Sequence, residues 1–290
     1  MADKQFIPNK IIIAVHPKMP EAIKEAASFE AWLNKSGLTV QCGLLDDAKM
    51  RLQVRNRDFD LLVAVGGDGT MLRAAQLCAP EGVPILGINL GRLGFLFQVG
   101  RNDWQDHFSR LLEGNYWIEK RMMLRAEHWR SGDTQGNWHA LNEAVICRGQ
   151  YIRPVLLSAS VDERLLTTYV ADGLIAATPT GSTAYALAAG GPILPPELRN
   201  ILLVPIAPHL SVDRAVVLSE GSTVSIQVHS DSGTVLSVDG QTPIHLEQKD
   251  IIKVRVGDYS ALFIRFGDPD YFYRNLTARM NENSKTGFPT

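Results

Sequence analysis

The sequence lacks an excess of charge of either sign. Its 29 Lys and Arg residues nearly balance 31 Asp and Glu residues, giving the 290 residues a formal net charge of −2. Nucleic-acid-binding proteins usually present a basic surface that attracts phosphates. The balance therefore argues against nucleic acid as a partner, and a hydrophobic fraction of 45% argues against a disordered chain.

Long apolar runs and paired cysteines are also missing. No run of about 18 apolar residues occurs, so we expect no membrane span and no membrane partner. The apolar residues 11–15 are too few for the hydrophobic region of a signal peptide, which needs at least about 7. Cys42, Cys78 and Cys147 lie far apart without a CxxC spacing, which favours buried free thiols of a cytoplasmic protein over a zinc site or redox pair.

The first part of the chain alternates strand-like and helix-like segments. Apolar runs at residues 10–15, 38–42, 60–65 and 83–89 predict strands. Residues 20–37 predict a helix that begins at Pro20 and ends at Gly37, and residues 70–79 predict another. This alternation is typical of parallel βα units, so we expect an α/β domain with a Rossmann-like parallel sheet over residues 8–119.

The pattern changes near Trp117 to short β-rich runs separated by turn residues such as Asp231-Ser232-Gly233. We therefore expect a β-rich second domain over residues 120–267. Residues 268–290 are less regular and predict a C-terminal tail that packs back on the first domain, with a short helix at residues 275–280.

A glycine-rich turn at residues 66–69 follows the apolar strand expected at residues 60–65. Gly66, Gly67 and Gly69 allow a close approach of the backbone to an anion, and a helix N-terminus follows. The charge of Asp68 repels phosphate, so it fits a group that takes a proton from a hydroxyl or engages a metal. The alternative is a tight turn with an incidental Asp, and the residues match neither GxxxxGK[ST] nor GxGxxG.

A second turn, TPTGSTAY at residues 178–185, follows another apolar strand. Its hydroxyls both donate and accept hydrogen bonds, which suits an uncharged ligand group such as a base or a ribose. The alternative is a helix cap made by Ser182 or Thr183. Tyr185 either stacks on a ring of the ligand or belongs to the core.

Three further features carry weaker signals. Asn142-Glu143 lies within a strand-like run, where adjacent side chains point to opposite faces, so one of them is expected at a bulge or strand end. The Asn142 amide suits the hydrogen-bonding groups of adenine, and the Glu143 carboxylate suits a ribose diol. Two polar residues on a solvent-exposed edge strand are an equally good alternative. Asp239-Gly240 predicts a hairpin turn, and Phe95 lies either in a pocket wall or in the core.

With these stretches in view, the chain resembles the NAD kinase family. The resemblance runs from about residue 11 to residue 266 and is strongest where TPTGSTAY is followed by GGPI. GGDG alone is less specific, since lipid kinases and phosphofructokinases carry related turns. The motifs are GGDGT (66–70), NLGRLGFL (89–96), LNEAVICRG (141–149), DGLIAATPTGSTAYALAAGGPI (172–193), PHLSVDRAVVL (208–218) and SVDGQ (237–241).

The resemblance implies transfer of the ATP γ-phosphoryl group to the 2′-hydroxyl of the adenosine ribose of NAD, giving NADP. It implies Mg²⁺ or another divalent ion, with no dedicated protein ligands assigned. It also implies an α/β domain followed by a β-sandwich-like domain, and a homodimer or homotetramer. Whether inorganic polyphosphate replaces ATP as the donor stays open. Relatives vary at the positions of Val170 and Ala171, so the choice between NAD and NADH as the acceptor stays open too.

Residue roles follow from the same resemblance. Asp68 matches the catalytic carboxylate, and Gly66, Gly67, Gly69 and Thr70 match the phosphate turn. The implied NAD-binding residues are Asn142 and Glu143 at the adenosine, Thr180 and Thr183 near the adenine, Asp172, Ala184 and Tyr185 near the nicotinamide, and Phe95 and Asp239 close to the ligand. Arg148 is a candidate ATP contact.

Two other functions remain as alternatives at this stage. A diacylglycerol-type lipid kinase built on the same GGDG turn would need a tunnel for acyl chains. A non-catalytic dinucleotide sensor would bind NAD without turnover, and Asp68 argues against it.

Overall fold

The structure is a computed structural model that describes residues 6–91, 94–150, 153–209, 213–230, 233–274 and 276. Internal contacts divide the chain into unit 1, Met1–Lys120 with Ala261–Thr290, and unit 2, Arg121–Ser260. Unit 2 is thus inserted into the sequence of unit 1. The sequence-based boundary was at residue 267, whereas residues 261–267 here belong to unit 1.

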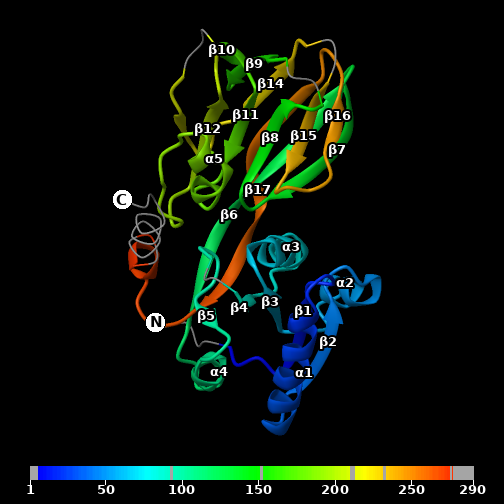
Figure 1. Cartoon of the computed structure of the whole chain (residues 1–290), viewed down its shortest axis with the longest axis vertical. Helices are drawn as coiled ribbons and strands as arrows, with labels where there is room; N and C mark the ends of the chain where they lie inside the picture. Colours follow the sequence, from blue (N-terminus) through cyan, green and yellow to red (C-terminus); the bar gives the residue numbers. More distant parts are fainter. Residues whose placement is uncertain are drawn as a thin grey trace, which may run out of the picture. The chain divides into compact units, whose positions relative to one another are not determined.

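Unit 1 is built on a parallel sheet (Figure 1). Its strands occur in the order β2-β1-β3-β4, and β4 pairs on its other side with β5 and with the end of β17. All of β3 and nearly all of β1 are buried, which explains their continuous apolar runs. The bounds are β1 Lys10–Val15, β2 Thr39–Leu44, β3 Leu61–Gly66, β4 Ile85–Asn89, β5 Val99–Gly100 and β17 Ile251–Arg265.

The described part of unit 1 contains the α-helices α1 to α4, and residues 271–274 are helical as well. Helix α1 has Pro20 as its first residue, and Gly37, at φ +83°, follows its C-terminus, as the sequence predicted. Phe29 and Leu33 of α1 are fully buried in the core of the unit with Phe108 of α4. The bounds are α1 Pro20–Lys35, α2 Ala48–Arg55, α3 Asp68–Cys78 and α4 Trp104–Leu112, and a 3-10 turn spans Ala79–Glu81.

Unit 2 is a sandwich of two β-sheets. In one sheet the order is β10-β9-β14-β17, and β6 pairs with β17 and β7; the other runs β13-β12-β11-β8-β15-β16. The bounds are β6 Trp117–Arg130, β7 Asp133–Ala140, β8 Glu143–Arg148, β9 Val155–Val161, β10 Arg164–Ala171, β11 Gly173–Ala177, β12 Asn200–Ile206, β13 Val216–Ser219, β14 Val224–Val228, β15 Thr234–Val238 and β16 Ile244–Leu246.

One apolar core joins the two sheets of the sandwich. Leu157 and Tyr169 enter it from the first sheet, and Ile146, Leu174 and Leu203 enter it from the second. The opposite face of the second sheet carries the short helix α5, Tyr185–Ala188, whose Ala186 packs with Val145 and Ile175. The expected α/β domain with a parallel sheet and the expected β-rich, sandwich-like domain are both confirmed.

Two local expectations were resolved by the structure. The run at residues 139–147 is not one strand, because β7 ends at Ala140 and β8 begins at Glu143. Asp239 and Gly240, both at positive φ, form a tight turn in which the Gln241 amide bonds to the Val238 carbonyl. The hairpin prediction for Asp239-Gly240 is therefore confirmed.

Some expectations concern residues outside those that the structure describes. They are the short helix at residues 275–280, apart from Leu276, the turn residues Asp231 and Ser232, and positions 92–93 and 210–212 of the quoted motifs. Within the described ranges, no helix combines the length and the apolar character that a membrane crossing requires.

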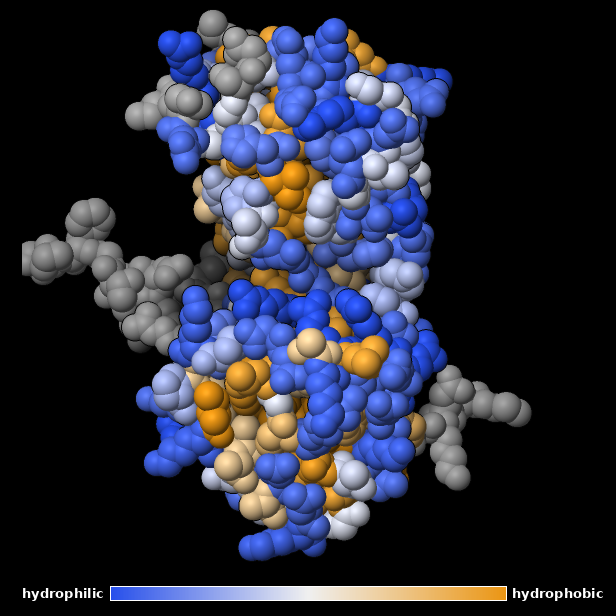
Figure 2. Space-filling model, turned by 90° about the vertical axis from the view of Figure 1, so that its right-hand side faces the viewer, coloured by the Kyte–Doolittle hydropathy of each residue, from blue (hydrophilic) through white to orange (hydrophobic). Residues whose placement is uncertain are grey.

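On the face drawn in Figure 2, hydrophobic residues form areas that hydrophilic residues border.

Candidate functional site

The GGDG turn lies at the carboxyl end of β3 and opens α3. Gly67 is the N-cap of α3 and Asp68 is its first residue, so the helix begins two residues earlier than the sequence predicted. Asp68 and Gly69 are exposed, whereas the Thr70 side chain is buried. A β-carbon at Gly66 would lie 2.3 Å from Oγ1 of Thr70, so the strand can enter this turn only through glycine.

Gly94 supports Asp68 from the next segment of unit 1. A β-carbon at Gly94 would lie 1.9 Å from Oδ1 and 2.6 Å from Oδ2 of Asp68. The Asp68 carboxylate therefore rests directly on the backbone of Gly94. The sequence analysis quoted Gly94 only as part of NLGRLGFL, since a glycine that makes room for a distant side chain has no local signature.

A buried ion pair holds the segment that follows Gly94. Arg265 of β17 donates to Glu119 at 2.8 Å and to the Leu96 carbonyl at 3.0 Å. Tyr271 donates its hydroxyl to the same Glu119 carboxylate, which ties the beginning of the expected tail to unit 1. Arg265 and Glu119 are 1% and 7% exposed, so this pair is strongly shielded from water. The sequence analysis did not single out any of these three side chains.

In unit 2, three neighbouring strands end at the same edge of the second sheet. Glu143 opens β8 opposite Ala177, the last residue of β11, and Ala144 pairs with Val238, the last residue of β15. Asn142 precedes β8, Thr178 follows β11 and Asp239 follows β15. The structure therefore brings together at one edge the Asn-Glu pair, the TPTG turn and the DGQ turn, which lie far apart in the sequence.

The TPTG turn is fastened to the backbone of residues 141 and 142. The Thr178 amide donates to the Asn142 carbonyl at 2.8 Å, and the Thr178 hydroxyl donates to the Leu141 carbonyl. A β-carbon at Gly181 would lie 2.2 Å from the Asn142 oxygen. The Thr180 hydroxyl accepts from buried Arg121 at 3.3 Å, a contact that the sequence analysis missed.

The hydroxyls of Ser182 and Thr183 do not cap a helix. The Ser182 hydroxyl is fully buried, donates to the Pro179 carbonyl at 2.6 Å and accepts from the Leu194 amide at 2.9 Å. The Thr183 hydroxyl donates to the Thr180 carbonyl at 3.1 Å. The cap alternative was therefore wrong, because the turn uses these hydroxyls within itself and with residue 194. Tyr185 is 46% exposed, which places it outside the core.

Glu143 occupies an unusual environment for a carboxyl group. It is 7% exposed, and its Oε2 atom has no hydrogen-bond partner among the described residues. Burial raises the pKa of Glu143 to about 8, and the nearby charge of Asp239 adds to the shift. Because side chains alternate along a strand, Glu143 shares a face with Val145, which packs with Ala186 of α5.

Asp172 and Arg148 lie at the other end of the same two strands. Cys147, next to Arg148, pairs with Gly173, next to Asp172, and the Arg148 guanidinium contacts the Asp172 carboxylate at 2.8 Å. Arg148 lies five residue steps along β8 from Glu143, or about 17 Å at about 3.3 Å per residue. Tyr185 interacts electrostatically with Glu143 and with Asp172. The structure therefore separates these candidates into two groups with Tyr185 in reach of both.

A metal ion would have few direct protein ligands here. Across the described residues, no cluster of three or more His, Cys, Asp or Glu side chains could hold a metal. Mg²⁺ usually keeps several waters and binds through one or two carboxylates together with substrate phosphates. The exposed carboxylate of Asp68, beside a helix N-terminus that suits phosphate, fits that mode of binding.

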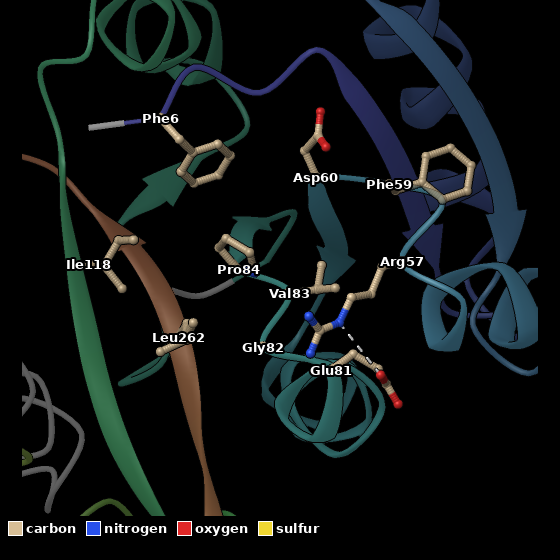
Figure 3. Close-up of a pocket in the computed structure, with 10 residues that line it drawn as sticks. All are labelled: Phe6, Arg57, Phe59, Asp60, Glu81, Gly82, Val83, Pro84, Ile118 and Leu262. Atoms are coloured by element: carbon tan, nitrogen blue, oxygen red, sulfur yellow. Dashed lines mark ion pairs between the residues drawn. The ribbon is translucent and has the colours of Figure 1, made fainter. Parts of the chain in front are cut away.

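Unit 1 also has a hollow of about 390 Å³ that is separate from the GGDG turn (Figure 3). Phe6, Ile118 and Leu262 line one side, and the Arg57–Glu81 ion pair lines another. The hollow lies at the amino ends of β3 and β4, beside residues 60 and 84, whereas Asp68 follows the carboxyl end of β3. Since none of the candidate residues lines it, this hollow is not the site that the motifs describe.

Comparisons with known proteins agree with the motifs. Residues 45–116 match the model of the ATP-NAD kinase N-terminal domain, and residues 141–266 match that of the C-terminal domain. An NAD kinase from Chloroflexus aggregans is 38% identical, with 95% of this chain and 99% of the relative covered. One from Heliobacterium modesticaldum is 39% identical, with 93% and 98% covered.

Two solved structures share the fold. Yeast NADH kinase complexed with NADH has a TM-score of 0.86 at 26% identity, covering 98% of this chain and 90% of that one. An NAD kinase from Archaeoglobus fulgidus in complex with ATP has a TM-score of 0.74 at 24% identity, covering 94% and 98%. Fold and family together define an enzyme of the phosphotransferase class. The chain belongs to the NAD kinase family, which removes the lipid-kinase and sensor alternatives.

Proposed function

We propose that in this NAD kinase Asp68 is the general base that takes the proton of the 2′-hydroxyl of the adenosine ribose. The observation that carries the proposal is the position of Asp68, exposed as the first residue of α3 and resting on Gly94. A carboxylate at that position accepts the proton as the oxygen attacks the γ-phosphorus of ATP, whose bond to the bridging oxygen breaks and releases ADP. Phosphoryl transfer otherwise depends on positioning and charge neutralisation.

The phosphate groups of ATP would bind at the N-terminus of α3. Gly67 and Gly69 leave space where side chains would otherwise lie, since a β-carbon at either position would have no neighbour within 4 Å among the described residues. The backbone amides of the first helical turn attract anions. Gly66 and the buried Thr70 fit a supporting role, because they pack against each other underneath the turn.

A divalent cation, Mg²⁺ by its usual association with ATP, would be held by the phosphates and by Asp68. When bound, it would neutralise charge on the transferred phosphoryl group. ATP is the expected donor, and the use of polyphosphate is a separate question for the assay described below.

For NAD, we propose that Asn142, Glu143, Thr180 and Thr183 bind the adenosine half. Asp172, Ala184 and Tyr185 would then meet the nicotinamide half. Glu143 and Arg148, the ion-pair partner of Asp172, lie about 17 Å apart along β8, which supports this assignment because it suits a dinucleotide in an extended conformation. Arg148 holds Asp172 through an ion pair, so we propose that it orients that carboxylate, and an ATP contact by Arg148 stays a prediction.

Phe95 remains a proposed NAD contact from unit 1. Its half-buried ring packs against Phe272 at a centroid distance of 6.3 Å, which fixes the ring without covering it completely. A fixed aromatic face of this kind suits stacking on a base.

We also propose that the chain forms a homodimer or homotetramer through β10. This strand is an edge of its sheet, and Leu165 and Leu166 are 67% and 42% exposed on it. An exposed edge strand with apolar side chains readily pairs with another chain. Light scattering would test this, since Leu165→Asp should lower the oligomeric mass. A cytoplasmic location is proposed as well, supported by the three free cysteines.

The test of the function is an assay of NADP formation. The purified protein is incubated with NAD, ATP and Mg²⁺, and NADP is measured with an NADP-specific dehydrogenase, with Asp68→Asn in parallel. The proposal expects NADP from the wild type and a large loss in the variant. NADP formation by the variant at the wild-type rate would remove Asp68 from the role of base. Replacing NAD by NADH, and ATP by polyphosphate, defines the acceptor and the donor.

A further inference from the structure

The Asp239 carboxylate accepts hydrogen bonds from three consecutive backbone amides. Oδ2 accepts from Leu141 at 2.8 Å, and Oδ1 accepts from Asn142 at 2.8 Å and from Glu143 at 3.0 Å. In return, the Asp239 amide donates to the Glu143 carbonyl at 3.0 Å. The segment that joins β7 to β8 is therefore fixed by a side chain from the turn after β15.

The conformation of Asp239 serves this arrangement. Its φ of +47° is rare for a residue with a side chain, although Asp and Asn tolerate it better than most. Gly240, at φ +67°, completes the turn. The turn thus contains a strained residue whose carboxylate contacts the backbone of residues 141–143. A turn that only reversed the chain direction would not need this contact.

These contacts place a negative charge beside a buried carboxyl group. Glu143 is 7% exposed, and the Asp239 charge repels the charged form of Glu143. The Tyr185 phenol of α5 also interacts electrostatically with Glu143, and its pKa is raised above its ordinary value of 10.0 by burial first and by nearby charges. Arg148, Asp172 and Cys147 lie at the far end of β8 and β11 and act on Tyr185.

We propose that Asp239 is a positioning residue for NAD, which holds the backbone of residues 141–143 and so presents Asn142 and Glu143 to the adenosine ribose. This inference rests on the proposed NAD-binding role of Asn142 and Glu143. It differs from a direct ligand contact, because the carboxylate oxygens of Asp239 already accept three amides. Asp239 acts on NAD only through the backbone that it holds and through the charge that it places beside Glu143.

The consequence is a proton-coupled binding step. An ionised Glu143 carboxylate accepts a hydrogen bond from a ribose hydroxyl with either oxygen, whereas the protonated form offers one fewer acceptor site and a donor. With a Glu143 pKa of about 8, only about one-tenth of the free protein has the ionised form at pH 7. NAD affinity should therefore rise about tenfold as the pH increases from 7 to well above 8.

The experiment measures NAD binding by calorimetry between pH 6.5 and 9.5 for the wild type and Asp239→Asn, as about seven points that bracket the Glu143 titration. Asn keeps one acceptor oxygen, but its amide group cannot accept from the Leu141 amide. We expect about tenfold weaker binding at high pH, with kcat at saturating NAD changed less than KM. Loss of the Asp239 charge should also move the midpoint of the pH dependence down by about one pH unit.

Asp162→Asn is the matched control. Asp162 also has positive φ, at +49°, and its carboxylate accepts from the Thr223 amide at 2.8 Å, in a turn away from the candidate residues. This variant should keep the wild-type affinity and midpoint. Glu143→Gln should bind NAD with no dependence on pH in this range, because the titrating group is gone.

The outcomes distinguish this inference from the proposed function. Asp239→Asn with unchanged affinity and an unchanged midpoint would overturn the inference while NADP formation by the wild type upheld the function. A wild type that neither binds NAD nor forms NADP would overturn the proposed function itself. If Asp239→Asn does not fold, as its melting temperature would reveal, the wild type still decides: a flat pH profile of NAD affinity contradicts the inference.

Discussion

The carboxylate of Asp68 lies so close to Gly94 that a β-carbon there would come within 1.9 Å of Oδ1. The two residues are 26 positions apart in the sequence and come from the turn after β3 and the segment before β5. The backbone of Gly94 thus restricts the position of the Asp68 carboxylate, which is the proposed base. Arg265 fixes the segment further along by donating to the Leu96 carbonyl.

Gly94→Ala should displace Asp68 and lower kcat about 100-fold, since errors of about 1 Å in positioning a reacting group have costs of that size. Gly91→Ala is the control, because among the described residues a β-carbon at Gly91 would meet only Oδ1 of Asn89, at 3.7 Å. Steady-state kinetics of both variants would check this. Equal effects from the two alanines would show that the contact with Asp68 is not responsible.

Asp68→Asn should lower kcat by about 10² to 10⁴-fold while NAD binding largely survives. The amide keeps the size of the side chain but does not take a proton. The comparison of kcat with the NAD dissociation constant separates the two effects. A variant with near-normal turnover would contradict the role of Asp68 as general base.

Gly181→Ala should raise the KM for NAD about tenfold and lower the free energy of unfolding by about 1–3 kcal/mol. The new methyl group would lie 2.2 Å from the Asn142 carbonyl oxygen, which is backbone and cannot rotate away. Gly221→Ala serves as the control, because no described residue would lie within 4 Å of its β-carbon. Thermal denaturation and kinetics measure the two effects, and a normal KM in Gly181→Ala would show that the Asn142 backbone is not needed for NAD.

The stability of unit 2 should fall in acid through Asp250. Burial alone would raise the pKa of this carboxyl, but hydrogen bonds from Arg130, the Glu247 amide and His128 outweigh it and lower the pKa to about 2. Because the folded-state pKa lies below the ordinary value of 3.8, the stabilisation is complete above about pH 4. It is lost as the pH falls through about 2.

Urea denaturation across that range would measure the loss. Asp250→Asn should be less stable near neutral pH and show a smaller decrease between pH 4 and pH 2. A wild-type slope equal to that of the variant would show that other carboxylates are responsible.

Local sequence patterns predicted much of the fold, because a strand buried on both faces has a continuous apolar run and proline favours the first turn of a helix. The buried strand β3 and the start of α1 at Pro20 are examples. The pattern did not locate the break between β7 and β8, since residues 139–147 are apolar enough to read as one strand. What breaks it is the Asp239 carboxylate, which takes the amides of residues 141–143 from 96 to 98 positions away.

In the candidate site, too, local motifs reveal some residues and not those that act over long distances in the sequence. Asp68 and Glu143 could be found from motifs, because their chemistry and their neighbours in the sequence are specific. Gly94, Arg121 and Arg265 could not, since each acts on a residue far away in the chain. Gly94 makes room for the Asp68 carboxylate, and Asp239 accepts the backbone amides of residues 141–143. Only the three-dimensional structure shows these two roles.

The insertion of unit 2 within the sequence of unit 1 determines when each can fold during synthesis. Domains usually fold in the order in which they leave the ribosome, starting from the N-terminus. Here unit 1 lacks Arg265 and Tyr271, the partners of Glu119, until nearly all of the chain has emerged. Unit 2, whose residues are contiguous, is complete at Ser260. In the nascent chain, unit 2 is therefore complete before unit 1, whose sheet gains its pairing with the end of β17 last.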